Sequence, residues 1–129
     1  MSTAVDQAYA HEMREARTRF ARGEFEEAFR HLERAHILGQ RHTWRHVESH
    51  VWMLRVGWAE RRPKEVVGQV FRIPAALLFS RLWVPVGNTG GANVSAFMPM
   101  PVPEDLAALV GGRKSVGIDT LSGERRTRG

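Results

Sequence analysis

The chain has no cysteine, and its 129 residues include a single tyrosine. Without thiols there can be no disulfide framework, no cysteine-based zinc finger and no thiol nucleophile, so a metal site would have to use His, Asp and Glu. Long uncharged apolar runs are also missing. Arg72, Pro74 and Arg81 interrupt the most apolar stretch, residues 66–86, and this argues against a transmembrane segment. The length suits one domain with a single core.

The chain carries a formal net charge of +5, but much of the excess lies near its end, at Arg113, Lys114, Arg125, Arg126 and Arg128. Such a tail does not by itself identify a nucleic-acid binder, and no specific nucleic-acid partner is predicted. The first residues, MSTAVDQ, lack the basic start and apolar core of a secretory signal, so we expect a cytoplasmic protein. We expect the tail, residues 111–129, to be flexible because it offers little apolar surface to bury.

Apolar residues recur at helical spacing in four segments. The first helix is predicted over about residues 5–22 and ends at Gly23, and the second follows from residue 25 to a stop at Gly39. Pro63 suits the first turn of a fourth helix, which Pro74 should bend or end. Thr43 is a plausible N-cap for the third helix. The predicted apolar face of that helix consists of Trp44, Val47, Val51, Leu54 and Trp58.

The first helix pair resembles a tetratricopeptide hairpin in its alternation of small and large residues, at Ala16, Gly23, Phe25, Ala28, Leu32 and Ala35. A solenoid usually needs three such repeats, and this chain offers one clear repeat and at most a degenerate second one. We therefore expect an all-α fold of four helices in a compact, tetratricopeptide-like arrangement, forming a single domain over residues 1–110.

Residues 84–102 are dense in glycine and proline and should form a strap without regular structure. The backbone amides of residues 87–91 could form an anion-binding nest. Alternatively, the strap packs Phe97, Met98 and Met100 across the helices. Pro103, Glu104 and Asp105 then look like the start of a short helix that runs to about residue 110.

Five of the six histidines lie between residues 31 and 50, namely His31, His36, His42, His46 and His50. Glu33 and His36 are spaced i, i+3 on the second helix, and His46 and His50 are spaced i, i+4 on the third, so each pair shares a helix face. We expect these four side chains to point inward and His11 to point to solvent. Helices in bundles present metal ligands with this spacing.

The favoured hypothesis is therefore a metal-binding helical domain whose ligands come from Glu33, His36, His46 and His50. Zinc would accept three or four of these groups. Iron or manganese would fit if Glu12, on the flank of the first helix, also joined.

Metal-free alternatives remain open from the sequence alone. Glu33 could bind His36, and Glu12 could bind His46 or His50, as ordinary buried hydrogen-bond partners. The histidines could also serve in general acid-base catalysis. The chain could instead be a tetratricopeptide-like interaction adaptor that binds a partner protein or a second copy of itself. A further alternative is attachment to an acidic polymer or a membrane surface through the tail and Arg14, Arg17 and Arg22. No arrangement of Ser or Asp marks a nucleophile, so enzyme activity stays undecided.

Three sequence motifs carry a resemblance to a known family. They are HLERAHILGQ at residues 31–40, the pair His46 and His50, and VPVGNTGGANVSAF at residues 84–97. With these motifs the chain resembles a bacterial family called domain of unknown function 3703, over roughly residues 8–110. The resemblance implies a small bacterial protein and brings with it no activity or ligand.

Overall fold

A computed structural model describes residues 3–80 and 82–111, and the predicted flexible tail lies outside this part of the chain except for Gly111. The helices are α1 (Ala4–Ala21), α2 (Phe25–Gly39), α3 (Thr43–Ala59), α4 (Pro63–Phe79) and the short α5 (Glu104–Ala107). The described residues form no strand. The all-α prediction is confirmed, and the expected helices lie close to their predicted positions.

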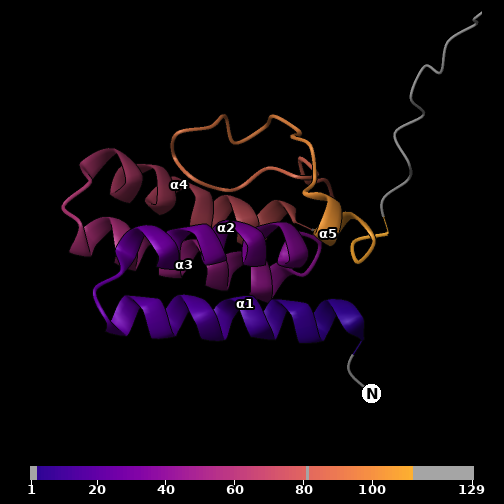
Figure 1. Ribbon diagram of the computed structural model, residues 1–129. Coiled ribbons are helices and arrows are strands. Elements are labelled where there is room, and N and C mark those ends of the chain that lie inside the picture. Colours follow the sequence, from indigo (N-terminus) through magenta and orange to yellow (C-terminus); the bar gives the residue numbers. More distant parts are fainter. Residues whose placement is uncertain (1–2, 81, 112–129) are drawn as a thin grey trace, which may run out of the picture.

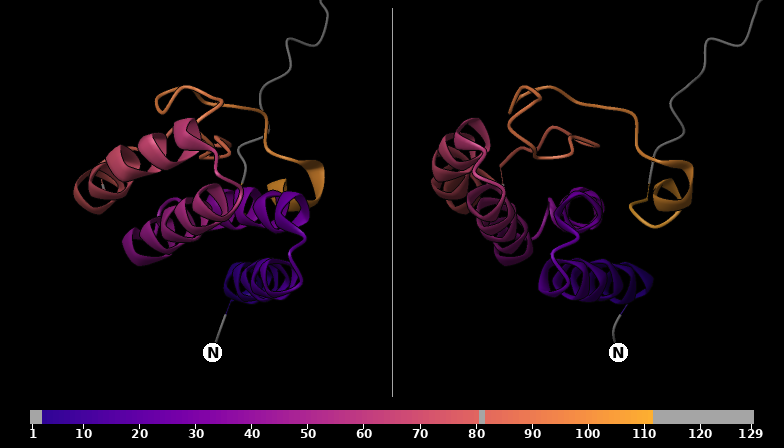
Figure 2. Two further views of the ribbon diagram at one scale, coloured as in Figure 1. Left: turned by 90° about the vertical axis from the view of Figure 1, so that its left-hand side faces the viewer. Right: turned by 60° about the vertical axis from the view of Figure 1, so that its left-hand side comes forward.

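Helices that follow one another in the sequence are also neighbours in space (Figures 1 and 2). The connecting segments 22–24, 40–42 and 60–62 are short, so α1 to α4 run back and forth, each antiparallel to the one before. None of the helices in the described segments is long and apolar enough to cross a membrane.

Local sequence explains most of the helix ends. Thr3 caps α1 by accepting a hydrogen bond from the Asp6 amide, and the Asp6 carboxylate accepts one from the Thr3 amide in return. Gly23 then takes a positive φ of 75°, which ends α1 at the residue type that adopts this conformation most readily. Pro63 occupies the first turn of α4, where its missing N–H is not needed.

Of the two effects predicted for Pro74, a bend or an end of α4, the end is wrong, because the helix continues to Phe79. Proline removes one backbone hydrogen bond, but the turns after it are held from outside the helix. Ala76 is buried, and the Ser80 hydroxyl at the end of α4 contacts His46 of α3.

The predicted apolar face of α3 is also wrong. Trp44 and Trp58 are 72% and 75% exposed. The helix instead buries a face whose members are His46, Ser49, His50, Met53, Val56 and Gly57. The physical reason is that the polar groups of this face find hydrogen-bond partners in the interior, which removes the cost of burying them.

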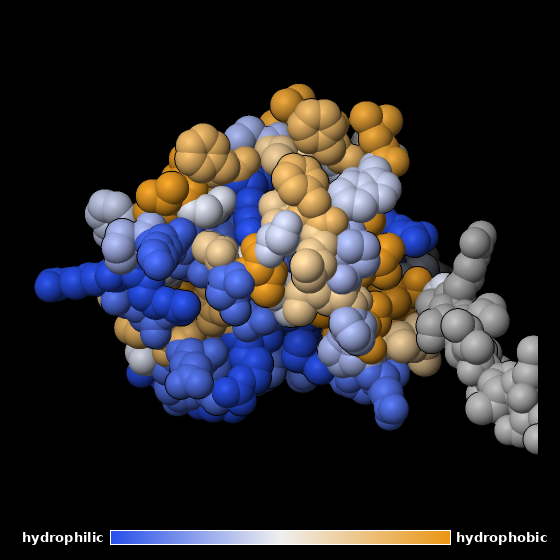
Figure 3. All heavy atoms as spheres, turned by 90° about the horizontal axis from the view of Figure 1, so that it is seen from above, coloured by the Kyte–Doolittle hydropathy of each residue, from blue (hydrophilic) through white to orange (hydrophobic). Residues whose placement is uncertain are grey.

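The strap, residues 84–102, crosses over the helices on the side opposite α1 (Figures 1 and 2). Its buried residues include Asn88 and Gly90, whereas Phe97 is 77% exposed and Met98 is also exposed. The prediction that Phe97 and Met98 pack onto the helices is therefore wrong. Figure 3 looks onto this side and shows hydrophobic side chains gathered along one margin of it. The strap is held mainly by polar contacts with α4.

Candidate metal centre

Helices α2 and α3 bring three histidines together in the interior. The ring centroids of His36 and His46 are 4.7 Å apart, those of His36 and His50 are 4.6 Å apart, and those of His46 and His50 are 4.9 Å apart. The three residues are 2%, 8% and 3% exposed, respectively. The expected inward direction of His36 and its convergence with His46 and His50 are confirmed. Each nitrogen of these buried, closely spaced rings needs a hydrogen-bond partner or another ligand.

The Nδ1 atom of His36 contacts the backbone oxygen of Asn88 in the strap, at 2.8 Å. A carbonyl oxygen can only accept a hydrogen bond, so Nδ1 carries the proton and donates it. In the neutral ring, Nε2 of His36 therefore keeps a free lone pair.

The Nδ1 atom of His50 contacts Oε1 of Gln69 on α4, at 2.6 Å. The orientation of this amide is fixed by its other end, because Nε2 of Gln69 donates to Oε1 of Glu65 at 2.6 Å and to the oxygen of Gly90 at 2.9 Å. Both of those oxygens are acceptors only. The Gln69 oxygen must then face His50, which again places the proton on Nδ1 and leaves the lone pair on Nε2.

The Nδ1 atom of His46 lies 2.8 Å from the Ser80 hydroxyl, at the end of α4. The Ser80 hydroxyl donates its hydrogen to the backbone oxygen of Ala76, so it must accept a hydrogen bond from His46. All three histidines thus share one arrangement, with Nδ1 donating to an oxygen and Nε2 left unprotonated. Histidines that bind metals are commonly held in this way by a second layer of acceptors.

Nitrogens of the three rings converge. The Nε2 atoms of His36 and His50 are 3.2 Å apart, and one nitrogen from each of the three rings can be chosen so that all lie within 4.8 Å of one another. Two neutral rings cannot form a hydrogen bond between unprotonated nitrogens, so the 3.2 Å contact brings lone pair against lone pair. A cation between them would make the contact attractive. Zinc with Zn–N bonds of 2.0–2.1 Å in tetrahedral geometry needs nitrogens about 3.3 Å apart.

Burial keeps these rings uncharged. Desolvation lowers the pKa of His46 from its ordinary value of 6.5 to about 4, and desolvation followed by the charge of His46 lowers the pKa of His50 to about 3. The pKa of His36 falls well below 6.5, first through desolvation and then through the charges of His50 and His46. At neutral pH the rings are in the unprotonated form that metal ions bind.

A pocket of about 450 Å³ opens onto the three histidines. Its walls are mostly apolar, and they come from the second half of α4, the segment that follows it, and the strap. Besides the histidines, the lining includes Arg72, Ala76, Phe79, Trp83, Asn88 and Phe97. This volume lies within the range that proteins use for small ligands.

The strap is fastened over the site by polar contacts. The guanidinium of Arg72 on α4 donates to the backbone oxygens of Gly90, Gly91 and Val94. The Glu65 carboxylate accepts from the Ala92 amide at 3.1 and 3.2 Å, and the Asn88 side chain donates to the oxygens of two further strap residues. These contacts position the Asn88 oxygen that holds His36.

The remaining predicted ligands lie apart from the three histidines. Glu33 is outside the group whose ligand atoms lie within 4.8 Å. Its carboxylate hydrogen-bonds to Thr89, and burial raises its pKa above the ordinary value of 4.5. The expected contact of Glu33 with His36 gives way to the bond between His36 and Asn88.

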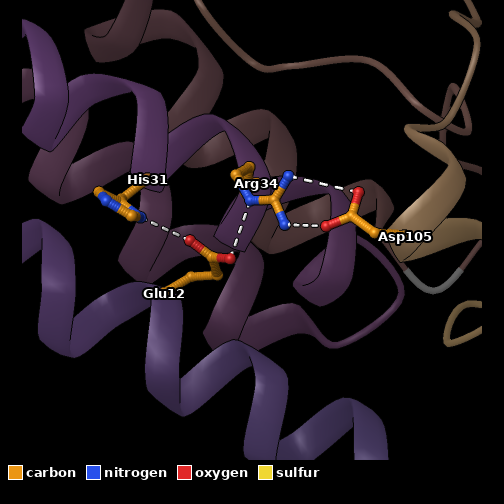
Figure 4. Close-up of polar contacts among 4 residues, drawn as sticks. All are labelled: Glu12, His31, Arg34 and Asp105. Atoms are coloured by element: carbon orange, nitrogen blue, oxygen red, sulfur yellow. Dashed lines mark hydrogen bonds and ion pairs between the residues drawn. The ribbon is translucent and has the colours of Figure 1, made fainter.

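Glu12 is committed elsewhere (Figure 4). Its carboxylate contacts Nδ1 of His31 at 2.7 Å and accepts from Nε of Arg34 at 2.8 Å, and Arg34 in turn pairs with Asp105 of α5. The expectation that Glu12 binds His46 or His50 is therefore wrong. The reason is that the flank of α1 faces α2, and this network joins α1, α2 and α5.

Sequence reasoning missed Gln69, Ser80 and Asn88, the residues that hold the three imidazoles. They lie 19 to 52 positions from the histidines that they contact. Their residue types carry no distinctive signal. The one local hint is the glycine-rich stretch around Asn88, which supplies an oxygen to His36 in place of the predicted anion-binding nest.

No curated protein and no solved structure matches the chain. A sequence profile described as protein of unknown function (DUF3703) matches residues 3–110, which contain all three histidines, their three partners and the strap. The chain therefore belongs to the DUF3703 family.

Proposed function

We propose that this protein binds a divalent metal ion through His36, His46 and His50. The observation that carries the proposal is the common arrangement of the three rings: each donates from Nδ1 to a fixed oxygen, and one nitrogen of every ring lies within 4.8 Å of the others. A purely structural cluster of histidines has no need to bring lone pairs 3.2 Å apart. A metal ion satisfies all three at once.

The donor set favours zinc. Three neutral imidazoles suit zinc, copper, nickel and iron, whereas manganese prefers oxygen ligands. Ferrous iron usually takes a carboxylate beside two histidines, and Glu33 and Glu12 are engaged elsewhere. The proposed site thus uses fewer of the predicted ligands and is less suited to iron and manganese than the sequence implied.

Three protein ligands would leave a coordination position open toward the apolar pocket. Closed zinc sites with four protein ligands serve structure, and sites with three serve ligand binding or catalysis. We therefore favour a site that holds a small ligand on the metal, inside a pocket that shields it from water.

The test is a metal titration of the full chain, purified without a histidine tag, stripped of metal by dialysis against a chelator, and freed of the chelator by further dialysis. Zinc, ferrous iron, manganese, nickel and copper are added separately, and bound metal is measured by elemental analysis and calorimetry. We expect saturation at a single zinc ion per chain. A wild-type protein without any saturable site would contradict the proposal and favour the metal-free interaction adaptor.

Two variants localise the binding. His46→Ala combined with His50→Ala should abolish zinc binding and leave most of the helicity, as judged by circular dichroism. His11→Ala is the matched control, because His11 is an exposed histidine on α1. Equal loss of zinc in both proteins would show that the buried histidines are not the ligands.

A further inference from the structure

The outward face of α4 is unusually apolar for a helix at the protein surface. Val67, Val70, Phe71 and Leu78 share one side of the helix, and all four are exposed, Phe71 by 74%. Their spacing of three and four residues places them in a continuous stripe. No element in the described part of the chain covers this stripe.

A second group of exposed apolar side chains lies at the mouth of the pocket. Trp83 and Phe97 are exposed, and together with Phe79 of α4 they line the pocket that leads to the histidines. Figure 3 shows that hydrophobic side chains also gather at the surface on the side of the molecule that the strap crosses. We call the set Val67, Val70, Phe71, Leu78, Trp83 and Phe97 the apolar surface. Exposed patches of this kind mark contact with another apolar surface.

Charge around the apolar surface is of one sign. Between residues 61 and 103 the only acidic residue is Glu65, which is 3% exposed and bonded to Gln69 and Ala92. Arg61 and Lys64, at the start of α4, are exposed. Residues 61–103 therefore combine exposed apolar side chains with cations at the start of α4, and their single carboxylate is buried.

We propose that the apolar surface docks on an anionic lipid bilayer. A helix that lies in a membrane interface combines an apolar face of Phe, Leu and Trp with flanking Lys and Arg, and α4 with its neighbours has this composition. Indole rings favour the headgroup level, where Trp83 would lie. Docking in this orientation turns the mouth of the pocket toward the lipid.

A second copy of the chain fits this surface less well. A two-fold interface brings each patch against its own copy, so both partners would add cations and neither would add an exposed carboxylate to balance them. Like charges held together in this way oppose association. An anionic bilayer supplies both the apolar interior and the negative charge that the surface lacks.

The experiment uses the full chain and lipid vesicles, made either of phosphatidylcholine alone or of phosphatidylcholine mixed with phosphatidylglycerol. Bound protein is measured by flotation. We expect binding to the mixed vesicles to exceed binding to the neutral ones by about tenfold or more, and to weaken as salt screens the charges. Equal and weak recovery with both vesicle types would overturn the proposal.

Substitutions separate the apolar surface from other basic parts of the chain. Phe71→Gln with Leu78→Gln should reduce binding to mixed vesicles by about tenfold or more, whereas Phe71→Leu with Leu78→Met should retain it. The basic residues near the end of the chain are present in both proteins. Binding that survives the glutamine substitutions would assign attachment to those residues and refute docking through α4.

The charge contribution has its own pair of variants. Lys64→Glu changes an exposed cation beside the apolar surface, and Arg14→Glu makes the same change on α1, on the opposite side from the strap. We expect only the first to weaken vesicle binding.

Sedimentation without lipid tests whether the chain associates with itself through the apolar surface. A dimer that the glutamine substitutions dissociate would identify the surface as a contact between copies and overturn the proposal. Zinc binding in the absence of vesicles, which should be unchanged in all these variants, reports separately on the metal site.

Discussion

Gly90 lies directly against the imidazole of His36. A Cβ atom at this position would come within 2.7 Å of Cδ2 and 2.8 Å of Nε2 of that ring, and the backbone of Gly90 has a φ of +83°. His36 is held on its other side by the Asn88 oxygen, so the ring cannot move away without losing that bond. The strap and Nε2 of His36 are thus packed against each other with no room for a side chain.

We expect Gly90→Ala to destabilise the fold by about 2–4 kcal/mol, because it combines a strained positive φ with overpacking. Zinc affinity should fall as well, since the added methyl group would meet Nε2 of His36. Denaturant unfolding and zinc calorimetry measure the two effects. Gly23→Ala is the matched control: φ there is +75°, but nothing lies within 4 Å of the new Cβ, so only the backbone strain of about 1 kcal/mol remains. Equal losses in the two variants would mean that Gly90 acts only through its backbone.

The sequence identified the helices and the three central histidines because both follow from local periodicity. His46 and His50 are one helical turn apart, and His36 shares a face with Leu32, so their directions follow from helix geometry. The predicted buried face of α3 was wrong for a related reason. Local periodicity places the apolar residues Trp44 and Trp58 on the buried side, whereas both are exposed. What overrode it is a set of polar partners on α4 and the strap.

Those partners could not be predicted, because hydrogen bonds such as His36 to Asn88 depend on tertiary packing over 52 positions of sequence. Glu12 shows the complementary error. It lies beside the apolar face of α1, as predicted, and is 6% exposed. Its hydrogen-bond partners, however, come from α2 and not from α3. Sequence spacing gives the face of a helix and leaves the choice of neighbour undetermined.

Ser80→Ala should weaken zinc binding by about tenfold to a hundredfold, the usual effect of removing a group that orients a metal ligand. Without the hydroxyl, Nδ1 of His46 loses its acceptor, and the ring is free to rotate or to change its protonated nitrogen. Zinc calorimetry measures the change. Ser95→Ala supplies the control, because Ser95 is an exposed serine of the strap. An unchanged affinity in Ser80→Ala would argue that His46 is not a ligand.

Glu12→Gln should lower stability by about 1–3 kcal/mol and leave zinc binding intact. The carboxylate is buried and holds both His31 and Arg34, whereas an amide satisfies these partners less well and carries no charge. Glu26→Gln is a suitable comparison, since it alters an exposed ion pair with Arg30 and should cost about 0.5 kcal/mol or less. If zinc affinity fell in Glu12→Gln, Glu12 would have to reach the metal.

Acid should destabilise the metal-free protein in a window set by the histidines. Their pKa values in the fold, about 4 for His46 and about 3 for His50, lie below the ordinary value of 6.5 that the unfolded chain has. Between these limits the unfolded state binds more protons than the folded one, so stability falls as pH drops below about 6.5. Above that pH both states are unprotonated at these rings, and the histidines contribute no slope. The shift at His46 corresponds to about 3 kcal/mol.

Unfolding in denaturant, measured at a series of pH values from 7.5 to 4.5 (roughly the span over which histidines titrate), should show this loss before the carboxylates with lowered pKa values lose their contribution to stability. The stability that Asp6 gains from its lowered pKa, about 2, is lost only below its ordinary value of 3.8, and the raised pKa of Glu33 acts in the opposite direction near 4.5. His46→Phe should flatten the slope, because it removes one titrating ring and keeps the site filled. Zinc should raise stability at neutral pH and make its loss on acidification steeper, since protons displace the metal from the imidazoles. A slope that is identical with and without zinc, and identical in His46→Phe, would contradict both the burial of neutral rings and their role as ligands.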